Sequence, residues 1–558
     1  MTHKPWLASY PAGVPAEIDP NRYQSLVHLA DESFAEFGAN TAYIQMDRGL
    51  TYAELDQKSR AFAAWLQQRV GLKRGDRVAI MLPNVLQYPI ALLGVLRAGG
   101  TVVNTNPLYT ARELEHQLKD SGAEVILILE NFAHVLQEVI ARTQVKTVLV
   151  TSVGELLGFP KGPIVDFVVR RVRKAVPPWQ LSGARRFAAV LREGEGLTYT
   201  RPELTHDDLA FLQYTGGTTG VSKGAMLSHG NMIANVLQSS AWTESALPRD
   251  LSNIAITALP LYHIFALTAN CILFLRLGWT NILITNPRDF PGFVAELKKY
   301  KFTYISGVNT LFNALLNTPG FAEVDFSHLK CTLGGGMAVQ RVVAERWKQV
   351  TGNILTQAWG LTETSPAACI NPIEVDFNDS IGLPIPSTEI GIANDAGEML
   401  PVGESGEIYV RGPQVMKGYY KRPEETAKVM LPGGWLRTGD IGRIDTRGFV
   451  YIEDRKKDMI NVSGFNVYPN EVESVAVTHP GVLEAAAVAK NDPHSGEAVA
   501  LFIVRKDPSL TAEAIVEHCR RSLTGYKVPK YVYFKNDLPK TNVGKILRRE
   551  LRDEAQKL

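Results

Sequence analysis

Residues 214–225 read Tyr-Thr-Gly-Gly-Thr-Thr-Gly-Val-Ser-Lys-Gly-Ala, and this stretch indicates both a fold and a ligand. Its glycines allow the backbone to adopt positive φ and to approach a ligand closely. Successive backbone N–H groups in such a loop form a concave anion site. The apolar run at 209–212 predicts a buried strand that leads into the loop. The residues expected to bind the phosphates are Thr215, Gly216, Gly217, Thr218, Thr219, Gly220 and Lys223.

Two common nucleotide motifs are absent from this stretch. A Walker A loop needs Lys followed by Ser or Thr, whereas here Ser222 precedes Lys223 and Gly224 follows it. The Gly-x-Gly-x-x-Gly spacing of dinucleotide-binding folds is also missing. P-loop kinases and nicotinamide dehydrogenases are therefore disfavoured. Taken alone, the run fits a flexible Gly/Thr hairpin equally well.

Length and composition describe an ordinary globular enzyme with several domains. At about 100–200 residues per domain, 558 residues predict three or more units. Lys and Arg number 59 and Asp and Glu 57, so the net charge of +2 gives no field that would attract nucleic acid. The four cysteines lie far apart without metal-ligand spacing. We expect them to be buried reduced thiols in a cytoplasmic protein.

No part of the sequence predicts a membrane span or a signal peptide, but one segment fits a membrane surface. Residues 159–179 combine apolar side chains with five basic residues against the single acid Asp166, a local charge of +4. A basic amphipathic helix of this kind can lie on anionic lipid. The alternative is a solvated helix packed on the body of the protein. A peripheral contact with the inner face of the membrane therefore stays open, as does a homodimer.

The predicted fold class is α/β, with strands and helices alternating along two regions. In the region 72–151 we expect strands at 78–82, 101–104 and 125–129 with helices at 87–97 and 111–121, and the region 300–360 repeats the style. The repeat has strands at 302–306, 330–333 and 354–358 and helices near 310–317 and 339–350. Such alternation implies parallel sheets covered by helices, with ligands at the carboxyl ends of the strands.

The last third of the chain has a different pattern. Short β segments with Gly and Pro turns between about 380 and 455 predict a β-rich subdomain. The final hundred or so residues predict strands at 484–489, 498–505 and 531–535 and a helix at 512–523, a small mobile α+β domain. The expected divisions are an N-terminal domain of two α/β subdomains plus the β-rich subdomain at 1–454, a hinge at 455–459 and a C-terminal domain at 460–558.

Three further sites fit the chemistry of a nucleotide. In the run 357–366, Glu363 offers hard oxygen ligands for Mg²⁺ and Trp359 offers a flat face for a purine. Asp440 can accept hydrogen bonds from two ribose hydroxyls, and Arg455 can donate to the same sugar. Near the C-terminus, Lys545 stands on a Gly turn before a basic helix. Each has an ordinary alternative, which is a helix cap for Glu363, a turn for Asp440 and a surface position for Lys545.

In this order, the four sites resemble the adenylate-forming superfamily of acyl-CoA synthetases, adenylation domains and luciferases over nearly the whole chain. Residues 214–225 resemble its phosphate loop, 359–363 its Tyr-Gly-x-Thr-Glu motif, 438–440 its ribose motif and Lys545 its C-terminal lysine. The departure is Trp359, where the wider family often has Tyr. The closer resemblance is to bacterial long-chain fatty-acid–CoA ligases, carried by residues 259–267, 454–460, 462–471 and 525–530.

The resemblance implies an enzyme that converts a fatty acid, ATP and CoA to acyl-CoA through acyl-AMP, with Mg²⁺ on Glu363 and Thr215. The implied catalytic residues are Lys545, Glu363, His263 and the hinge residue Lys457. Besides the phosphate loop, the implied ATP or AMP residues are Gly335, Gly336, Met337, Ala358, Trp359, Gly360, Leu361, Thr362, Asp440 and Arg455. The implied CoA residues, reached after the C-terminal domain rotates, are Val462, Ser463, Gly464, Phe465, Tyr526 and Lys527.

The acyl tunnel is expected along Gly360, Val236, Phe265 and Val308. Acetate-activating relatives place Trp at the position of Gly360, so Gly predicts an open tunnel. His263 fits a place near the carboxylate and phosphates and equally well a satisfied core histidine. Rival functions are a carrier-loading fatty acyl–AMP ligase, a medium-chain or aryl acid ligase, and a non-catalytic nucleotide sensor. Against the first, no hinge-restraining insertion stands between Asp440 and Val462.

Overall fold

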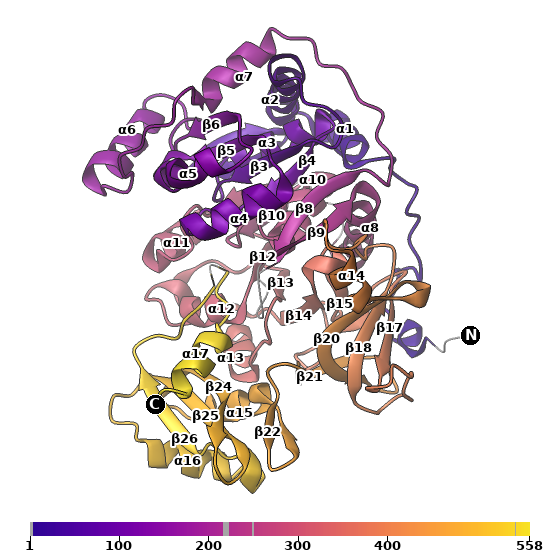
Figure 1. Cartoon of the computed structure of the whole chain (residues 1–558), viewed down its shortest axis with the longest axis vertical. Coiled ribbons are helices and arrows are strands. Elements are labelled where there is room, and N and C mark those ends of the chain that lie inside the picture. The colour runs from indigo at the N-terminus through magenta and orange to yellow at the C-terminus, as the bar shows by residue number, and fades with distance from the viewer. Residues whose placement is uncertain (1–3, 216–221, 248–249, 251, 542) are drawn as a thin grey trace.

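The computed structural model of the chain describes residues 4–215, 222–247, 250, 252–541 and 543–558. Two helix-covered sheets form the upper body in Figure 1, a β-rich subdomain lies beside the second sheet, and the yellow C-terminal domain lies below them. This arrangement confirms the predicted fold class. Among the described residues, no helix combines the length and apolar character that a membrane span requires.

The first sheet has seven strands and carries the phosphate-loop residues at one edge. Its order is β7 (Arg185–Arg186), β6 (Thr147–Thr151), β5 (Val125–Leu129), β3 (Arg77–Met81), β4 (Thr101–Asn104), β8 (Leu209–Thr215) and β9 (Lys223–Ser228). All neighbours are parallel except β8 and β9, which pair antiparallel. The interior strand β5, Val-Ile-Leu-Ile-Leu, is buried throughout because helices cover both faces of the sheet.

Four predicted elements of this region, α3 (Gln87–Arg97), α4 (Ala111–Ser121), β4 and β5, have the predicted bounds, and β3 begins and ends one residue earlier than predicted. Helix α4 shows why. Thr110 and Glu113 form a capping box at its start, and Gly122 ends it in the left-handed conformation. The other helices of the N-terminal half are α1 (Leu26–Phe37), α2 (Tyr52–Trp65), α5 (Ala133–Val139), α6 (Lys161–Phe167), α7 (Phe187–Glu195) and α8 (His229–Ala246).

The second sheet has nine strands and collects segments from distant parts of the chain. Its order is β16 (Leu383–Pro384), β15 (Ala367–Ile370), β14 (Leu355–Gly360), β13 (Cys331–Gly334), β12 (Tyr304–Gly307), β10 (Ile254–Thr257), β11 (Thr280–Leu283), β1 (Thr41–Gln45) and β2 (Arg48–Thr51). The strands from β14 to β1 are parallel, and the two ends of the sheet are antiparallel. Pairing of β1 with β11 was not predicted, since it joins residues about 240 positions apart.

Helices α9 (Ile264–Ala266), α10 (Leu273–Leu277), α11 (Phe290–Leu297), α12 (Asn309–Leu316) and α13 (Arg341–Thr351) belong to this second layer. The predicted strands and helices of the region 300–360 are all present, displaced by one or two residues. The four cysteines are buried free thiols, as predicted.

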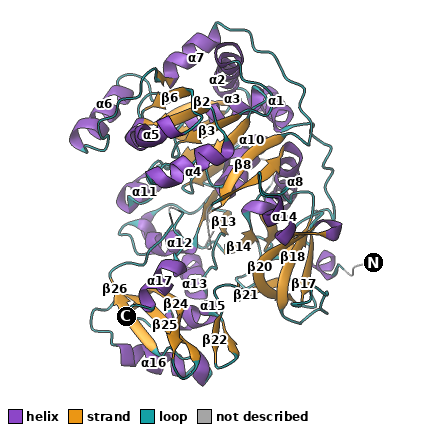
Figure 2. Cartoon of the chain, in the orientation of Figure 1, coloured by secondary structure: helices purple, strands orange, loops and turns teal. Residues whose placement is uncertain are grey.

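The β-rich subdomain predicted between about 380 and 455 is a five-stranded antiparallel sheet, seen at the right of Figure 2 where β17, β18 and β20 are labelled. It contains β17 (Glu389–Ala393), β18 (Gly406–Arg411), β19 (Met430–Leu431), β20 (Trp435–Ile444) and β21 (Val450–Arg455), with α14 (Pro423–Val429) beside it. Strand β20 presents the ribose motif, and β21 pairs Arg455 with Asp440.

The C-terminal domain has its own sheet and its own hydrophobic cores. Its strands are β22 (Ile460–Val462), β23 (Phe465–Val467), β24 (Val482–Asp492), β25 (Gly496–Arg505) and β26 (Tyr531–Lys535), and its helices are α15 (Pro469–Ala476), α16 (Ala512–Arg520) and α17 (Arg548–Ala555). The predicted helix at 512–523 ends earlier, at Arg520. The change from one sheet to the other falls between Arg455 and Ile460, and the domain boundaries themselves stay a prediction.

Candidate active site

A cavity of about 680 Å³ lies where the two α/β sheets, the β-rich subdomain and the C-terminal domain meet. Residues at the ends of β8 and β14 line it, as the rule for parallel sheets predicts. Lys545 of the C-terminal domain also lines it, although it stands 182 positions after Glu363, another lining residue.

One end of the cavity is charged and carries the described phosphate-loop residues. Thr215 and Lys223 line it; Gly216, Gly217, Thr218, Thr219 and Gly220 lie outside the described residues. Lys223 Nζ lies 2.7 Å from a carboxylate oxygen of Glu425 and 4.9 Å from the ring centre of Tyr419. The Tyr419 hydroxyl donates to Glu363 Oε1 at 2.6 Å. Lys223, the cation expected to bind phosphate, and Glu363, the carboxylate expected to bind the metal, thus both contact Tyr419.

Sequence analysis missed the segment that contacts Lys223 and Glu363, which is residues 416–420 of the β-rich subdomain. Its backbone forms two hydrogen bonds with Met226 of β9, since Lys417 N donates to Met226 O and Met226 N donates to Gly418 O. At its start, Met416 N donates to the carbonyl of Glu363 at 2.8 Å. We call residues 416–420 the clasp. The sequence of the clasp contains no phosphate-binding pattern. Only its pairing with β9 shows that it lies beside the charged end of the cavity.

Asp440 itself does not line the cavity, and its side chain is only 3 % exposed, but its partners Trp359 and Arg455 do line it. Trp359 donates its indole N–H to one carboxylate oxygen at 3.0 Å, and Arg455 Nε lies 3.0 Å from the other. The predicted adenosine residues Gly335, Gly336, Ala358, Gly360, Leu361 and Thr362 line the same cavity, whereas Met337 does not. The indole N–H of Trp359 thus orients the Asp440 carboxylate. The motif alone did not predict this contact.

Lys545 reaches the polar part of the cavity. A Cβ added to Gly336 would lie 3.3 Å from Lys545 Cε, so glycine at 336 makes room for the lysine stem. Burial lowers the pKa of Lys545 to about 8; the charge of Arg455 acts in the same direction, and Asp440 and Glu363 oppose it. Lys457, the predicted hinge residue, also lines the cavity, and burial lowers its pKa.

His263 lines the cavity as a neutral imidazole. Its Nδ1 accepts a hydrogen bond from the backbone N–H of Phe265 at 3.3 Å, so the ring proton is on Nε2. Burial and, to a lesser degree, Lys545 lower its pKa to about 3. The structure thus places His263 beside the cavity and also gives it a local structural bond, and both interpretations retain support.

Glu363 and Thr215 fit Mg²⁺ by their chemistry. Both line the charged end and offer hard oxygen donors, a carboxylate and a hydroxyl. Mg²⁺ is commonly held by one or two such protein oxygens together with substrate phosphates and water. The residues present therefore suit a metal that arrives with ATP.

The far end of the cavity is predominantly apolar. Its lining includes Trp242, Phe265, Ala269, Leu273, Tyr304, Cys331, Leu333, Ile370 and Ile373. Of the predicted tunnel residues, Gly360 and Phe265 lie on the wall; Val236 and Val308 are buried but do not line it. Val308 instead lies against Gly336 and Gly544, next to Lys545.

The expectation that Gly360 leaves the tunnel open needs correction. A Cβ at this position would lie 1.8 Å from the carbonyl oxygen of Pro366, so the side-chain direction points at backbone and not into open space. Strand β15, which pairs with β14, brings that backbone close. Glycine is required here by close strand contact.

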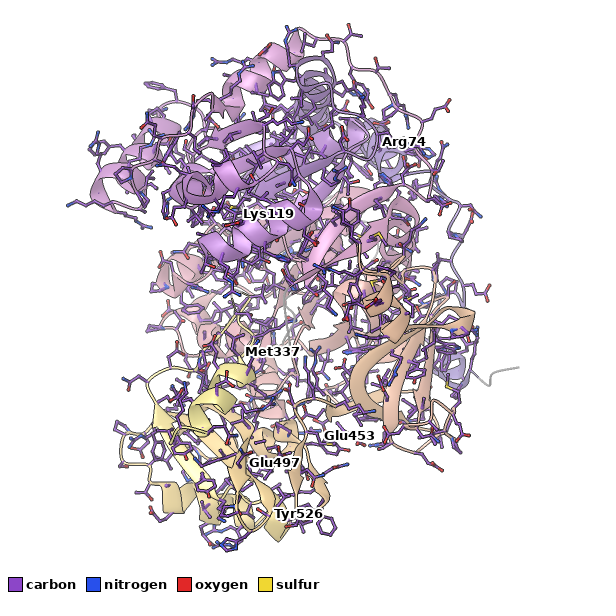
Figure 3. All side chains as sticks on the ribbon, viewed as in Figure 1. Arg74, Lys119, Met337, Glu453, Glu497 and Tyr526 are labelled. Atoms are coloured by element: carbon purple, nitrogen blue, oxygen red, sulfur yellow. The ribbon has the colours of Figure 1, made fainter. Side chains whose placement is uncertain are left out.

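The six predicted CoA residues are not brought to the cavity, and none of them lines it. Phe465 is 58 % exposed and stacks on Tyr526 with ring centres 4.9 Å apart, while Lys527 pairs with Glu471. In Figure 3, Tyr526 lies at the far end of the C-terminal domain from Met337, which lies between the two domains. The described arrangement therefore brings most of the predicted nucleotide residues together with Lys545 and leaves the predicted CoA residues outside the cavity.

Comparison with known proteins agrees with this geometry. The family model for AMP-binding enzymes matches residues 30–420, and the model for their C-terminal domain matches residues 471–545. The chain belongs to the AMP-binding enzyme family. The resemblance inferred from its motifs is thereby confirmed.

Two relatives of this family named long-chain-fatty-acid–CoA ligase align over almost the full chain. The protein from Escherichia coli O6:H1 is 57% identical over 99% of this chain and 98% of its own length, and that from Bacillus subtilis 39% identical over 99% and 98%.

Two solved structures share the fold. ATP-bound MatB from Rhodopseudomonas palustris has a TM-score of 0.79 at 27% identity, covering 95% of this chain and 98% of that one. The anthranilate CoA ligase AuaEII with anthranoyl-AMP has a TM-score of 0.85 at 23% identity, covering 96% and 99%.

Proposed function

We propose that this enzyme joins a long-chain fatty acid to CoA in two steps, with acyl-AMP as the intermediate. The observation that carries the proposal is the cavity itself, whose lining combines Lys545, Glu363 and Arg455 with a set of apolar side chains. The two relatives described above carry the name of this activity over nearly the same length.

In the first step, a carboxylate oxygen of the fatty acid forms a bond to the α-phosphorus, and the bond from that phosphorus to the departing pyrophosphate breaks. Positioning and charge stabilisation supply most of the catalysis in such transfers. Asp440 would hold the ribose hydroxyls, and Lys223 would hold the departing phosphates. Lys545 would neutralise the charge that develops between carboxylate and α-phosphate. Mg²⁺, held by Glu363 and Thr215, would supply further positive charge to the phosphate oxygens.

In the second step, the CoA thiol gives up its proton to water and its sulfur forms a bond to the acyl carbon. The bond from that carbon to the phosphate oxygen of AMP breaks, and AMP leaves. Rotation about Lys457 would replace Lys545 by the segment 462–465, with Tyr526 and Lys527 nearby. Gly464 has φ +88° and nothing lies within 4 Å of where its Cβ would be, which leaves space for a pantetheine arm.

The acyl chain would lie in the apolar end of the cavity. Each buried methylene contributes about 0.8 kcal/mol, so affinity should rise steeply with chain length. This property separates a long-chain ligase from an aryl acid ligase with the same nucleotide site.

Pyrophosphate release with acetate, octanoate, palmitate or benzoate, with and without CoA, tests the proposal. Palmitate should give the highest kcat/KM, and sustained turnover should require CoA. Preference for benzoate would favour an aryl acid ligase. Turnover supported only by a carrier protein would favour a carrier-loading enzyme. No pyrophosphate release with any acid would favour a nucleotide sensor.

The role of Lys545 can be tested separately. Lys545→Ala should abolish acyl-AMP formation and spare thioester formation from supplied palmitoyl-AMP. Equal loss of both half-reactions would contradict its role.

A contact with the cytoplasmic face of the membrane is the second part of the proposal. Helix α6 and the helical turn Val168–Val172 project at the left of Figure 1, with Phe159 91 % exposed and Val172 65 % exposed. Arg171 and Arg173 are exposed nearby. Apolar side chains beside cations suit anionic lipid.

Arg170 does not belong with Arg171 and Arg173 as a residue proposed to face lipid. Its guanidinium forms two hydrogen bonds to Glu130, at 2.7 and 2.9 Å, and so anchors the segment to the body. Arg171→Ala/Arg173→Ala should reduce pelleting with vesicles that contain anionic lipid and leave pelleting with neutral vesicles unchanged. Arg520→Ala/Arg521→Ala, two exposed arginines at the end of α16, is the matched control. Equal losses in the two pairs would refute a specific surface.

A further inference from the structure

Helix α12 of the N-terminal domain bonds to the C-terminal domain at two points. The Thr310 hydroxyl donates to the carbonyl of Gly544 at 3.0 Å, and the Asn313 side-chain amide donates to the carbonyl of Leu483 at 3.3 Å. Residues three positions apart lie on the same helix face. Figure 1 shows α12 next to the yellow C-terminal segment that leads into α17.

The first bond lies directly beside Lys545. Gly544 has φ +85°, and a Cβ there would lie 2.7 Å from Thr310 Oγ1 and 3.2 Å from Val308 Cγ2. This contact therefore demands glycine. The turn is closed on its other side, because Lys545 N donates to Thr541 Oγ1 at 3.0 Å and Thr541 N donates to the Lys545 carbonyl at 2.7 Å. Fixing the Gly544 carbonyl thus fixes the base of the lysine side chain.

We infer that Thr310 and Asn313 are positioning residues that dock the C-terminal domain for the first half-reaction and hold Lys545 in the cavity. The inference rests on the proposed two-step function. Neither residue lines the cavity, so both act through the docked domain. Both acceptors belong to a domain that must rotate before the second step, so the two bonds exist only in the adenylating arrangement. They should favour the first half-reaction and contribute nothing to the second.

The experiment measures the two half-reactions separately in the full-length enzyme. Thr310→Val keeps the shape of the side chain and removes the donor. It should slow single-turnover formation of palmitoyl-AMP from ATP and palmitate about threefold to tenfold, the range expected for one hydrogen bond. Thioester formation from supplied palmitoyl-AMP and CoA should be unchanged or faster. Thr310→Ser, which restores the hydroxyl, should recover the first rate, and Thr310→Val/Asn313→Ala should lose more than either single variant.

Thr318→Val is the matched control, because Thr318 follows the same helix but its hydroxyl bonds within the N-terminal domain, to the Ala314 carbonyl. It should leave both half-reactions unchanged. Equal loss of both rates in Thr310→Val, or no loss of the first, would overturn the inference. Should Thr310→Val lower the unfolding temperature, Asn313→Ala carries the same test. A wild-type enzyme that forms no palmitoyl-AMP would instead refute the proposed function.

Discussion

At the scale of single residues, the environment of Lys545 decides how the proposed first step depends on pH. Burial disfavours the charged ammonium, and Arg455 adds repulsion, so the pKa falls from 10.5 to about 8. The pKa is lowered, and therefore the cation is present below pH 8 and is lost as pH rises through this value. An ordinary surface lysine would keep its charge two units higher.

We expect kcat/KM for ATP in palmitoyl-AMP formation to fall as pH rises through about 8, since this ratio reports groups of the free enzyme. Lys545→Arg retains a charge at all these pH values, so its rate, although lower, should not show the same decline. Stopped-flow measurement of the first half-reaction across pH checks this. An identical decline in the arginine variant would assign the titration to another group.

Gly360 gives a second prediction at this scale. Gly360→Ala forces a Cβ to within 1.8 Å of the Pro366 carbonyl unless the backbone moves. We expect the free energy of unfolding to fall by about 1–3 kcal/mol and activity on octanoate and palmitate to fall in the same proportion. Gly525→Ala, where nothing lies within 4 Å, is the control. A selective loss of palmitate activity would restore the tunnel interpretation of this glycine.

At the scale of elements, the clasp joins parts that the sequence keeps apart. It pairs with β9, which begins at Lys223, and with the turn at Glu363, so the β-rich subdomain positions the phosphate end of a site built on the α/β sheets. Gly418, in its middle, has φ +133°, and a Cβ there would lie 2.7 Å from Thr426 Cγ2. The backbone path of the clasp therefore requires glycine at this point.

The clasp predicts a role for the Tyr419 hydroxyl in holding Glu363. Tyr419→Phe removes the 2.6 Å hydrogen bond and keeps the ring beside Lys223. Calorimetry should show affinity for ATP falling about tenfold or more with Mg²⁺ present and staying unchanged with Mg²⁺ chelated, because hydrogen bonds to charged groups contribute about 1.5–3 kcal/mol. Tyr420→Phe is the control, as Tyr420 does not line the cavity. Equal losses with and without the metal would contradict a role through Glu363.

At the scale of the whole molecule, one arrangement cannot serve both proposed half-reactions. Lys545 is in the cavity wall, while the exposed Phe465 and its stacking partner Tyr526 do not line the cavity. The two domains have separate hydrophobic cores, so they can rotate relative to each other without exposing either core.

Phe465 provides the prediction at this scale. Phe465→Ala should raise KM for CoA about threefold to tenfold, the loss expected for one aromatic contact, and should leave palmitoyl-AMP formation unchanged. Steady-state kinetics with CoA and supplied palmitoyl-AMP measures the effect. Met399→Ala, at another exposed apolar position, should change neither step. A defect in palmitoyl-AMP formation would mean that Phe465 acts before the domain rotates.

Local sequence was sufficient for most elements and for choosing the residues that we propose for the site. Helix α4 has its capping box and its terminal glycine within the helix and its flanks, and β5 is a continuous apolar run, so both were predicted with correct bounds. Lys223, Glu363, Asp440 and Lys545 were found because their motifs are short and contiguous. Local physics decides such features, because capping, turn geometry and burial periodicity act over a few residues.

Only the tertiary structure decided which distant segments meet. The clasp and the contact of α12 with Gly544 depend on backbone atoms of residues about 190 to 230 positions apart, and the walls of the apolar end come from equally distant segments. Backbone N–H and carbonyl groups are the same at every residue, so a sequence cannot show which of them will pair. The place of Val308 beside Gly544 could not be predicted for the same reason, since that neighbour belongs to the C-terminal domain.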